Sequence, residues 1–286
     1  MLCILYTIAV GTCLALAGWA VEFALPPRAL RRWVWLSTIT LSMAIPPLFR
    51  AKHALHVPIT ANTGDLSWWA RVGVFDPYAL RAWDWAELIL LSWAVLAALA
   101  LAHRVRRTRV AQSIVDDVPV TVTSDMGPAT YGWLRPRIVL PLWVMQLPEQ
   151  ERSYVVRHEA EHLKSRDSSL LFITSLLLIL TPWYLPLWWQ VRRLAHAIEL
   201  DCDERVIRSL GNSNRYAKLL LNAAQVPGYA VQMQPSFLGV KGSLERRLKA
   251  LITPMSVRPF YRYCLVAIAV LALVLVMRTP HPLVMH

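Results

Sequence analysis

The chain has 286 residues, of which 56% are hydrophobic and 17% are charged, and its net charge is +12. Because soluble domains are usually about a quarter charged, this composition argues against an ordinary soluble protein and favours a membrane protein. The basic excess fits cytoplasmic loops and anionic headgroups, and no compact basic cluster is interleaved with aromatic residues on a polar segment, so we expect a lipid bilayer as partner and no direct contact with nucleic acid.

Apolar runs in the first part of the chain predict three transmembrane helices, at residues 2–21, 33–49 and 86–102. No lysine or arginine precedes the first run, so a retained span with its N-terminus outside fits better than a cleaved signal peptide. Tryptophan and tyrosine are frequent in residues 50–84, which is typical of a loop at the membrane surface. Arginines follow the first and third runs, so we expect the chain to enter the cytoplasm after Ala102.

Residues 113–141 differ in character and predict two or three short strands joined by turns. Residues 118–123 alternate and are rich in β-branched side chains, and residues 137–140 follow two glycine-containing segments. Pro136 and Pro141 bracket this last strand, which predicts a position at the edge of the sheet. An edge strand beside a peptidase site can bind an extended substrate by strand addition, and a plain β-hairpin is the alternative.

The next segment contains the motif H-E-x-x-H, formed by His158, Glu159 and His162. On a helix His158 and His162 lie on one face, where both imidazoles can bind one zinc ion, and Glu159 can act as general base. The same residues also fit H-x-x-E-H, so the spacing alone leaves open whether Glu159 or Glu161 is the base. A polar helix with two solvated histidines is the alternative without a metal.

The helix that carries this motif is expected to run from Pro148 to about Asp167, and an apolar stretch at residues 170–189 follows it. Basic residues flank both ends of this stretch, so both ends look cytoplasmic. Pro182 and Pro186 interrupt it as a turn would. We therefore expect a broken, re-entrant or interfacial hairpin rather than a simple crossing.

Residues 192–209 predict a further helix, in which Glu199 and Asp203 share one face. A glutamate on a second helix is the third ligand that a His, His, Glu zinc site needs, so we assign this role to Glu199. Asp203 would hold the free ring nitrogen of a ligating histidine. The four cysteines show no C-x-x-C spacing, so any zinc must be held by histidine and carboxylate. A solvated, salt-bridged helix is the alternative.

The remaining residues complete a division of the chain into three parts. Residues 1–112 hold three transmembrane helices with an aromatic outer loop. Residues 113–262 form a cytoplasmic-facing metallopeptidase domain with the membrane-dipping hairpin. Residues 263–286 form a last transmembrane helix and a short outer tail. The expected fold class is a polytopic α-helical membrane protein with an α+β metallopeptidase domain.

Taken together, the chain resembles the BlaR/MecR-type membrane metallopeptidases, the antirepressor family of β-lactam sensor-transducers. The resemblance is carried by three ordered motifs: Y-G-W-L-R-P-R-I-V-L-P (131–141), H-E-A-E-H (158–162) with Asp167, and E-L-D-C-D-E-R-V (199–206). Looser matches follow at R-Y-A (215–217) and L-E-R-R (244–247). It implies a gluzincin-type site in which the zinc ligands are His158, His162 and Glu199. It also implies that Glu159 is the catalytic base and that Asp203 and Asp167 support the ligands.

We therefore expect a zinc metalloendopeptidase of the inner (cytoplasmic) membrane, with its active site facing the cytoplasm. The resemblance implies a role as an antirepressor that cleaves a transcriptional repressor and so regulates antibiotic resistance. A housekeeping membrane metallopeptidase and a non-catalytic sensor or scaffold of the same fold are the alternatives. A transporter is disfavoured, since no inverted repeats are evident.

A protein substrate and a second copy of the chain, as a homodimer, are the expected protein partners. Only a stub follows Met277, and no S-x-x-K motif occurs in the chain. We therefore expect a family member without the C-terminal penicillin-binding sensor domain, which does not itself react with a β-lactam.

Overall fold

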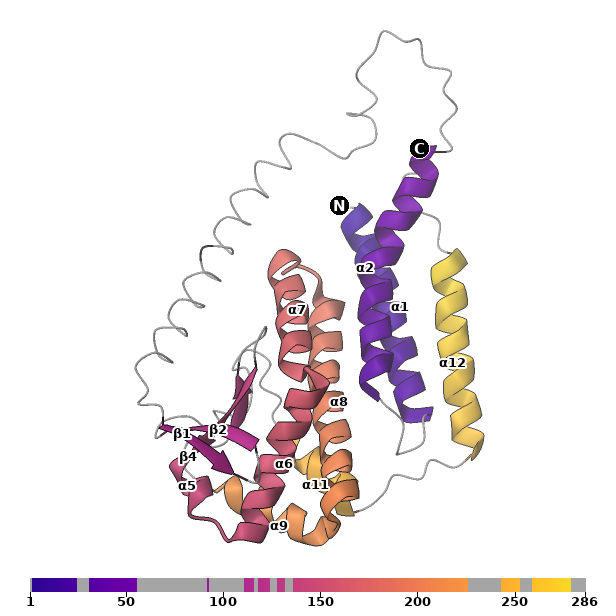
Figure 1. The fold of residues 1–286 in the computed structure, drawn as a ribbon. Helices are drawn as coiled ribbons and strands as arrows, with labels where there is room; N and C mark the ends of the chain where they lie inside the picture. Colours follow the sequence, from indigo (N-terminus) through magenta and orange to yellow (C-terminus); the bar gives the residue numbers. More distant parts are fainter. Residues whose placement is uncertain are drawn as a thin grey trace, which may run out of the picture.

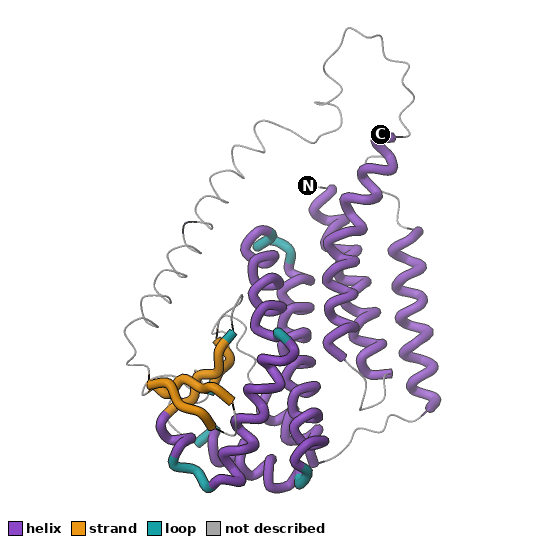
Figure 2. The backbone as a smooth tube through the Cα atoms, in the orientation of Figure 1, coloured by secondary structure: helices purple, strands orange, loops and turns teal. Residues whose placement is uncertain are grey.

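The computed structural model describes residues 2–24, 31–55, 92, 111–115, 118–123, 128–131, 136–225, 243–252 and 259–278. Within this part of the chain the fold is mostly helical, with one small sheet (Figure 2). The predicted aromatic loop and the third predicted span, at residues 50–84 and 86–102, lie almost wholly outside the described residues. The tail at 279–286 lies outside them as well.

Three long apolar helices lie side by side, α1 (Leu2–Ala24), α2 (Arg31–Leu55) and α12 (Pro259–Arg278) (Figure 1). Among the described helices, one is long and apolar enough to cross a membrane, over Leu5–Ala24. The apolar part of α12, Tyr263–Val276, is shorter. Helix α1 contacts α12 through small side chains, which let two helix backbones approach closely: Ala17, Ala20, Ala269 and Ala272.

The apolar stretch after the histidine motif forms a helical hairpin, so the chain turns back within this stretch. Helix α7 (Asp167–Leu180) and helix α8 (Leu185–Leu210) are joined by a turn at residues 181–184 that contains Pro182. Pro186 lies in the first turn of α8, where its missing N–H removes no helical hydrogen bond. Helix α8 therefore continues without a break from the apolar stretch into the segment that carries Glu199.

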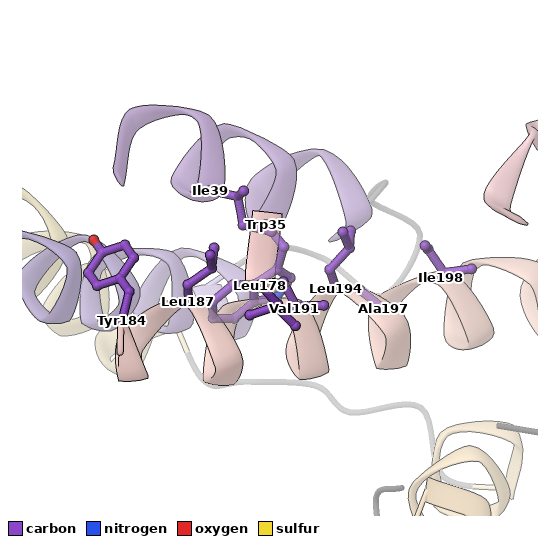
Figure 3. Packing of buried hydrophobic residues seen from close by; sticks show 9 residues of the cluster. All are labelled: Trp35, Ile39, Leu178, Tyr184, Leu187, Val191, Leu194, Ala197 and Ile198. Atoms are coloured by element: carbon purple, nitrogen blue, oxygen red, sulfur yellow. The ribbon is translucent and has the colours of Figure 1, made fainter. Parts of the chain in front are cut away.

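Helix α8 packs along α2 in one apolar core, which Figure 3 shows from close by. The core joins side chains of α2, α7 and the α7–α8 turn to one face of α8: Trp35, Ile39, Leu178, Tyr184, Leu187, Val191, Leu194, Ala197 and Ile198. All of these side chains are buried. Burial of a large apolar side chain is worth about 1.5–3 kcal/mol, so this contact fixes α8 against α2.

Buried polar contacts also join α8 to α1 and α2. The Gln190 amide nitrogen donates to the Gly11 carbonyl oxygen at 3.1 Å and to Ser42 Oγ at 2.9 Å. Arg193 pairs with Glu22, whose carboxylate also accepts from Trp35 Nε1 at 3.0 Å. A Cβ at Gly11 would overlap the Tyr184 hydroxyl oxygen, so the close approach of α1 to this turn requires glycine.

The sheet has four strands in the order β1-β2-β4-β3: β1 (Ala111–Val115), β2 (Val118–Thr123), β3 (Ala129–Tyr131) and β4 (Arg137–Pro141). Strand β4 pairs in parallel with β2 and antiparallel with β3. The prediction that the strand at residues 137–140 lies at the edge is therefore wrong. Pro136 precedes the ladder and Pro141 is its last residue, so neither removes an N–H from the interior of the strand. The edge strands among the described residues are β1 and β3.

The remaining short helices gather with the sheet at one end of the α7–α8 hairpin (Figure 1): α5 (Leu142–Met145), α6 (Glu149–Ser165), α9 (Ser213–Ala223) and α11 (Ser243–Ile252). Helix α6 begins after Pro148, as predicted, with Pro148 as its N-cap. Val156 packs α6 on the sheet, against Val120 and Ile138. Tyr154, on another side of α6, packs against α8 and α9, so α6 is held between the sheet and the helices.

Candidate metal centre

The two histidines of the H-E-x-x-H motif meet as the helix spacing predicts. His158 and His162 lie four residues apart on α6, and their Nε2 atoms are 3.2 Å apart. The two rings stand edge to face at 87°, with their centroids 4.6 Å apart. His158 is buried, and its contacts come from α8 and α9 as well as from its own helix.

Glu199 of α8 brings a carboxylate to the same point. Its Oε2 lies 3.6 Å from His158 Nε2 and its Oε1 lies 3.6 Å from His162 Nε2. The ligand atoms of a tetrahedral zinc ion are roughly 3.3–3.6 Å apart, given bonds of about 2.0–2.2 Å to nitrogen and oxygen. The three donors thus have the chemistry and the mutual spacing of a His, His, Glu zinc site.

A second set of donors overlaps with the first. His158, His162 and Cys202 each offer a ligand atom within 4.8 Å of the other two. The Cys202 sulfur lies 3.3 Å from His158 Nδ1 and also donates to the His158 carbonyl oxygen at 3.3 Å. This sulfur is therefore beside the ring nitrogen that faces away from Glu199, and it is engaged with the α6 backbone.

The outer nitrogen of His158 is surrounded by a buried polar network. Its Nδ1 lies 3.1 Å from the Tyr216 hydroxyl oxygen and 3.4 Å from Asp203 Oδ1. Tyr216 donates to Asp203 at 2.7 Å, and Arg247 of α11 donates to both Asp203 oxygens at 2.7 and 2.6 Å. Arg247 also pairs with Glu199 Oε2 at 2.9 Å. One guanidinium therefore contacts both carboxylates that reach His158.

The outer nitrogen of His162 has a single carboxylate partner. His162 Nδ1 lies 2.8 Å from Asp167 Oδ2, and Asp167 is buried. Asp167 reaches back to α6 because Arg166, between α6 and α7, adopts left-handed backbone angles with φ of 53°. This turn ends α6 and starts α7 with Asp167 as its first residue. The other Asp167 oxygen faces Arg32 of α2 at 3.3 Å.

The two glutamates between the histidines lie in different surroundings. Glu159 accepts a hydrogen bond from Thr130 Oγ1 on the edge strand β3, at 3.0 Å. Glu161 pairs with Arg157 and with Arg205, both at 3.0 Å. Both glutamates are buried. Glu161 is thus neutralised by two guanidiniums, whereas the Glu159 carboxylate has a hydroxyl partner on the strand beside the site.

The charges of the candidate ligands follow from burial and from their neighbours. Burial lowers the pKa of His158, but Cys202 and Glu199 beside it outweigh burial and raise the pKa to about 10. Burial also lowers the pKa of His162, but Cys202, Asp167 and Glu199 outweigh burial and raise this pKa. Burial raises the pKa of Glu199, and Arg247 and the two histidines lower it well below its usual range. Glu199 is therefore a carboxylate at neutral pH, and the histidines must release protons to bind a cation.

The structure brings together five of the six residues that the sequence assigns to the site, and the sixth, Glu159, lies on the motif helix and contacts Thr130. His158, His162 and Glu199 converge on one point, with Asp167 at His162 and Asp203 at His158. The sequence pattern did not indicate the contacts by which four further residues reach the site: Thr130, Tyr216, Arg247 and Arg32. Each comes from another element, at a distance along the chain with no periodic relation to the motif.

Comparison with known proteins gives two matches. The model of the family described as BlaR1 peptidase M56 matches residues 66–251. The regulatory protein BlaR1 of Bacillus licheniformis is 29% identical over 103 residues. That match covers 35% of this chain and 17% of the relative, so it spans less than a fifth of the relative's length.

Proposed function

Since the chain belongs to the BlaR1 peptidase M56 family, we propose that it is an integral membrane zinc endopeptidase with a gluzincin-type site. The observation that carries the proposal is the convergence of His158, His162 and Glu199, with ligand atoms 3.2 to 3.6 Å apart. When bound, a zinc ion there lowers the pKa of a water ligand towards about 7 and polarises a peptide carbonyl. In this proposal Cys202 is not a ligand.

Glu159 is the general base in this proposal. It takes a proton from the attacking water and delivers it to the leaving amine. Thr130 Oγ1, 3.0 Å from Glu159 Oε2, orients the carboxylate. The ion pairs of Glu161 with Arg157 and Arg205 support a structural role for Glu161, which leaves Glu159 as the base.

The edge strand β3 aligns the substrate in this proposal. Thr130 is the middle residue of β3, and its side chain reaches the motif helix while the strand pairs on one side with β4. An extended peptide could add to the other side of β3 and form backbone hydrogen bonds with it. The peptide would then run past Thr130, whose side chain contacts Glu159. The substrate is then a protein segment in extended conformation.

The membrane assignment rests on α1, α2 and α12 and on the charge pattern. Helix α12 exposes a run of large apolar side chains, among them Val270, Leu271 and Leu275, each more than half exposed, as in a helix that faces lipid. The arginines at the start of α2 lie beside the metal centre, which supports a position on the cytoplasmic side. We propose that the chain spans the membrane several times and that a cytoplasmic transcriptional repressor is its substrate.

The experiment compares new protein N-termini in cells that express the wild type and the Glu159→Gln variant, with the zinc content measured in both purified proteins. We expect zinc in both proteins and N-termini that appear with the wild type alone. A repressor among the cleaved proteins supports the antirepressor role, whereas many unrelated membrane proteins favour a housekeeping peptidase. Zinc in both proteins with identical N-termini, also after β-lactam treatment, would favour a non-catalytic scaffold.

A further inference from the structure

The first turn of α2 contacts the carboxylate that holds one of the proposed ligands. Arg32 Nη1 lies 3.3 Å from Asp167 Oδ1, and the other oxygen of the same carboxylate lies 2.8 Å from His162 Nδ1. The Arg32 side chain is 14% exposed and that of Asp167 is 2% exposed, so water screens this pair little. Asp167 therefore links the start of an apolar helix directly to the metal centre.

The same turn also contacts the helix that carries Glu199. The Asp201 carboxylate accepts hydrogen bonds from the backbone nitrogens of Arg31 and Arg32, at 3.4 and 3.3 Å. These are the first N–H groups of α2, which have no partner within their own helix. A carboxylate at a helix N-terminus is stabilised by the helix dipole. Asp201 lies two residues after Glu199, so α2 contacts the helix of Glu199 directly and the helix of the two histidines through Asp167.

We infer that Arg32 is a positioning residue that orients His162 through Asp167, so that the place of α2 sets the geometry and affinity of the metal site. This inference rests on the proposed function. A carboxylate at the outer nitrogen of a ligating histidine fixes its tautomer and ring orientation and raises its basicity. The guanidinium of Arg32 contacts that carboxylate, and the packed core between α2 and α8 fixes the helix that carries Arg32. A shift of α2 relative to α8 thus changes the metal site.

Arg31 provides a matched control for this inference. It precedes Arg32 in the same turn and carries the same charge. Arg31 contacts Asp201 through its backbone N–H, which an alanine substitution retains. If only the local positive charge matters, alanine substitution of either arginine should weaken zinc binding equally. If Arg32 positions His162, only Arg32→Ala should weaken it.

The experiment measures the zinc affinity of the full-length purified protein by competition with a chelator, together with the visible absorption spectrum of the cobalt-substituted protein. Substitutions of outer partners of metal-ligating histidines typically weaken metal binding about 10–100-fold. We expect about tenfold weaker zinc binding and a changed cobalt spectrum for Arg32→Ala, and wild-type values for Arg31→Ala. Arg32→Lys retains one donor and should recover most of the affinity. In the Asp167→Asn background, Arg32→Ala should have little further effect, because the two changes break one chain of contacts.

The outcomes separate this inference from the proposed function. If the wild type binds zinc and Arg32→Ala has wild-type affinity and spectrum, the positioning role is wrong while the peptidase proposal stands. Equal losses in Arg31→Ala and Arg32→Ala also overturn it, in favour of a charge effect. If Arg32→Ala does not fold, the cobalt spectra of Arg32→Lys and Asp167→Asn replace it as the test. An unchanged cobalt spectrum together with an unchanged zinc affinity in Asp167→Asn overturns the inference. A wild type that binds no zinc refutes both proposals.

Discussion

The carboxylate of Glu199 and the thiol of Cys202 contact opposite nitrogens of the His158 ring. Glu199 Oε2 lies 3.6 Å from Nε2, and the Cys202 sulfur lies 3.3 Å from Nδ1. The two residues are three apart on α8, so both face α6, but the imidazole lies between them. The carboxylate therefore lies beside the His158 nitrogen that faces His162, whereas the sulfur lies beside the other nitrogen.

The first prediction compares these two residues. Glu199→Ala removes a ligand, so its zinc affinity should fall by more than the roughly 10–100-fold that outer contacts contribute. Cys202→Ser removes a sulfur that lies at the outer nitrogen and the carbonyl oxygen of His158, so it should retain stoichiometric zinc. Zinc per protein, measured by elemental analysis after dialysis against a weak chelator, distinguishes the variants. Loss of zinc in Cys202→Ser with retention in Glu199→Ala would assign the site to cysteine.

The second prediction concerns the two glutamates of the motif. Loss of a general base lowers the rate about 10²–10⁴-fold, so Glu159→Gln should lower turnover by this factor with zinc retained. Glu161→Gln removes ion pairs with Arg157 and Arg205 and should lower the melting temperature, while turnover per zinc-loaded molecule stays within a few-fold of wild type. Turnover is followed on the substrate identified from the N-termini. An inactive Glu161→Gln with an active Glu159→Gln would assign the base to Glu161.

The third prediction concerns the buried pair of Arg247 and Asp203. Arg247→Met leaves the Asp203 carboxylate buried without its guanidinium partner, and breaking such a pair costs about 3–5 kcal/mol. Arg246→Met is the matched control, because Arg246 is exposed and such changes usually fall within about 0.5 kcal/mol. Thermal melting of the zinc-free proteins keeps metal binding out of the comparison. Equal melting temperatures for the two variants would show that the pair does not stabilise the fold.

The fourth prediction concerns protons. The pKa of His158 is raised to about 10 and that of His162 is raised as well, so the metal-free site holds protons that a metal must displace at pH 7. Both rings must be neutral to bind a metal, so zinc binding at pH 7 should release protons. Zinc affinity should therefore increase as the pH rises towards 10. Calorimetry in two buffers of different ionisation enthalpy counts the protons, and a binding heat that is the same in both buffers would contradict the raised pKa values.

Sequence patterns predict the parts of the site that follow from helix periodicity. The spacing of His158 and His162 places both rings on one face of α6, and Pro182 marks the turn of the α7–α8 hairpin. The pattern also predicts that Glu199 and Asp203 lie on one helix face, and both side chains do reach His158. These features are local, so a single segment contains the information that specifies them.

Contacts between distant elements are not specified in this way. Arg247 is 44 residues from Asp203, and Arg32 is 135 residues from Asp167. From the sequence, the charge of Arg32 served only to predict which side of the membrane its segment lies on. The order of the strands depends on crossovers that the short strand sequences do not encode, and the prolines beside β4 gave the wrong position in the sheet. Long-range packing, rather than local pattern, decides these contacts.

The most direct test of a zinc centre held by His158, His162 and Glu199 is X-ray absorption spectroscopy at the zinc edge of the purified wild-type protein. We predict nitrogen and oxygen neighbours at about 2.0–2.2 Å, with the pattern of two imidazole rings and no sulfur. A sulfur neighbour at about 2.3 Å would instead place Cys202 in the site, and a spectrum without imidazole would contradict the assignment of both histidines.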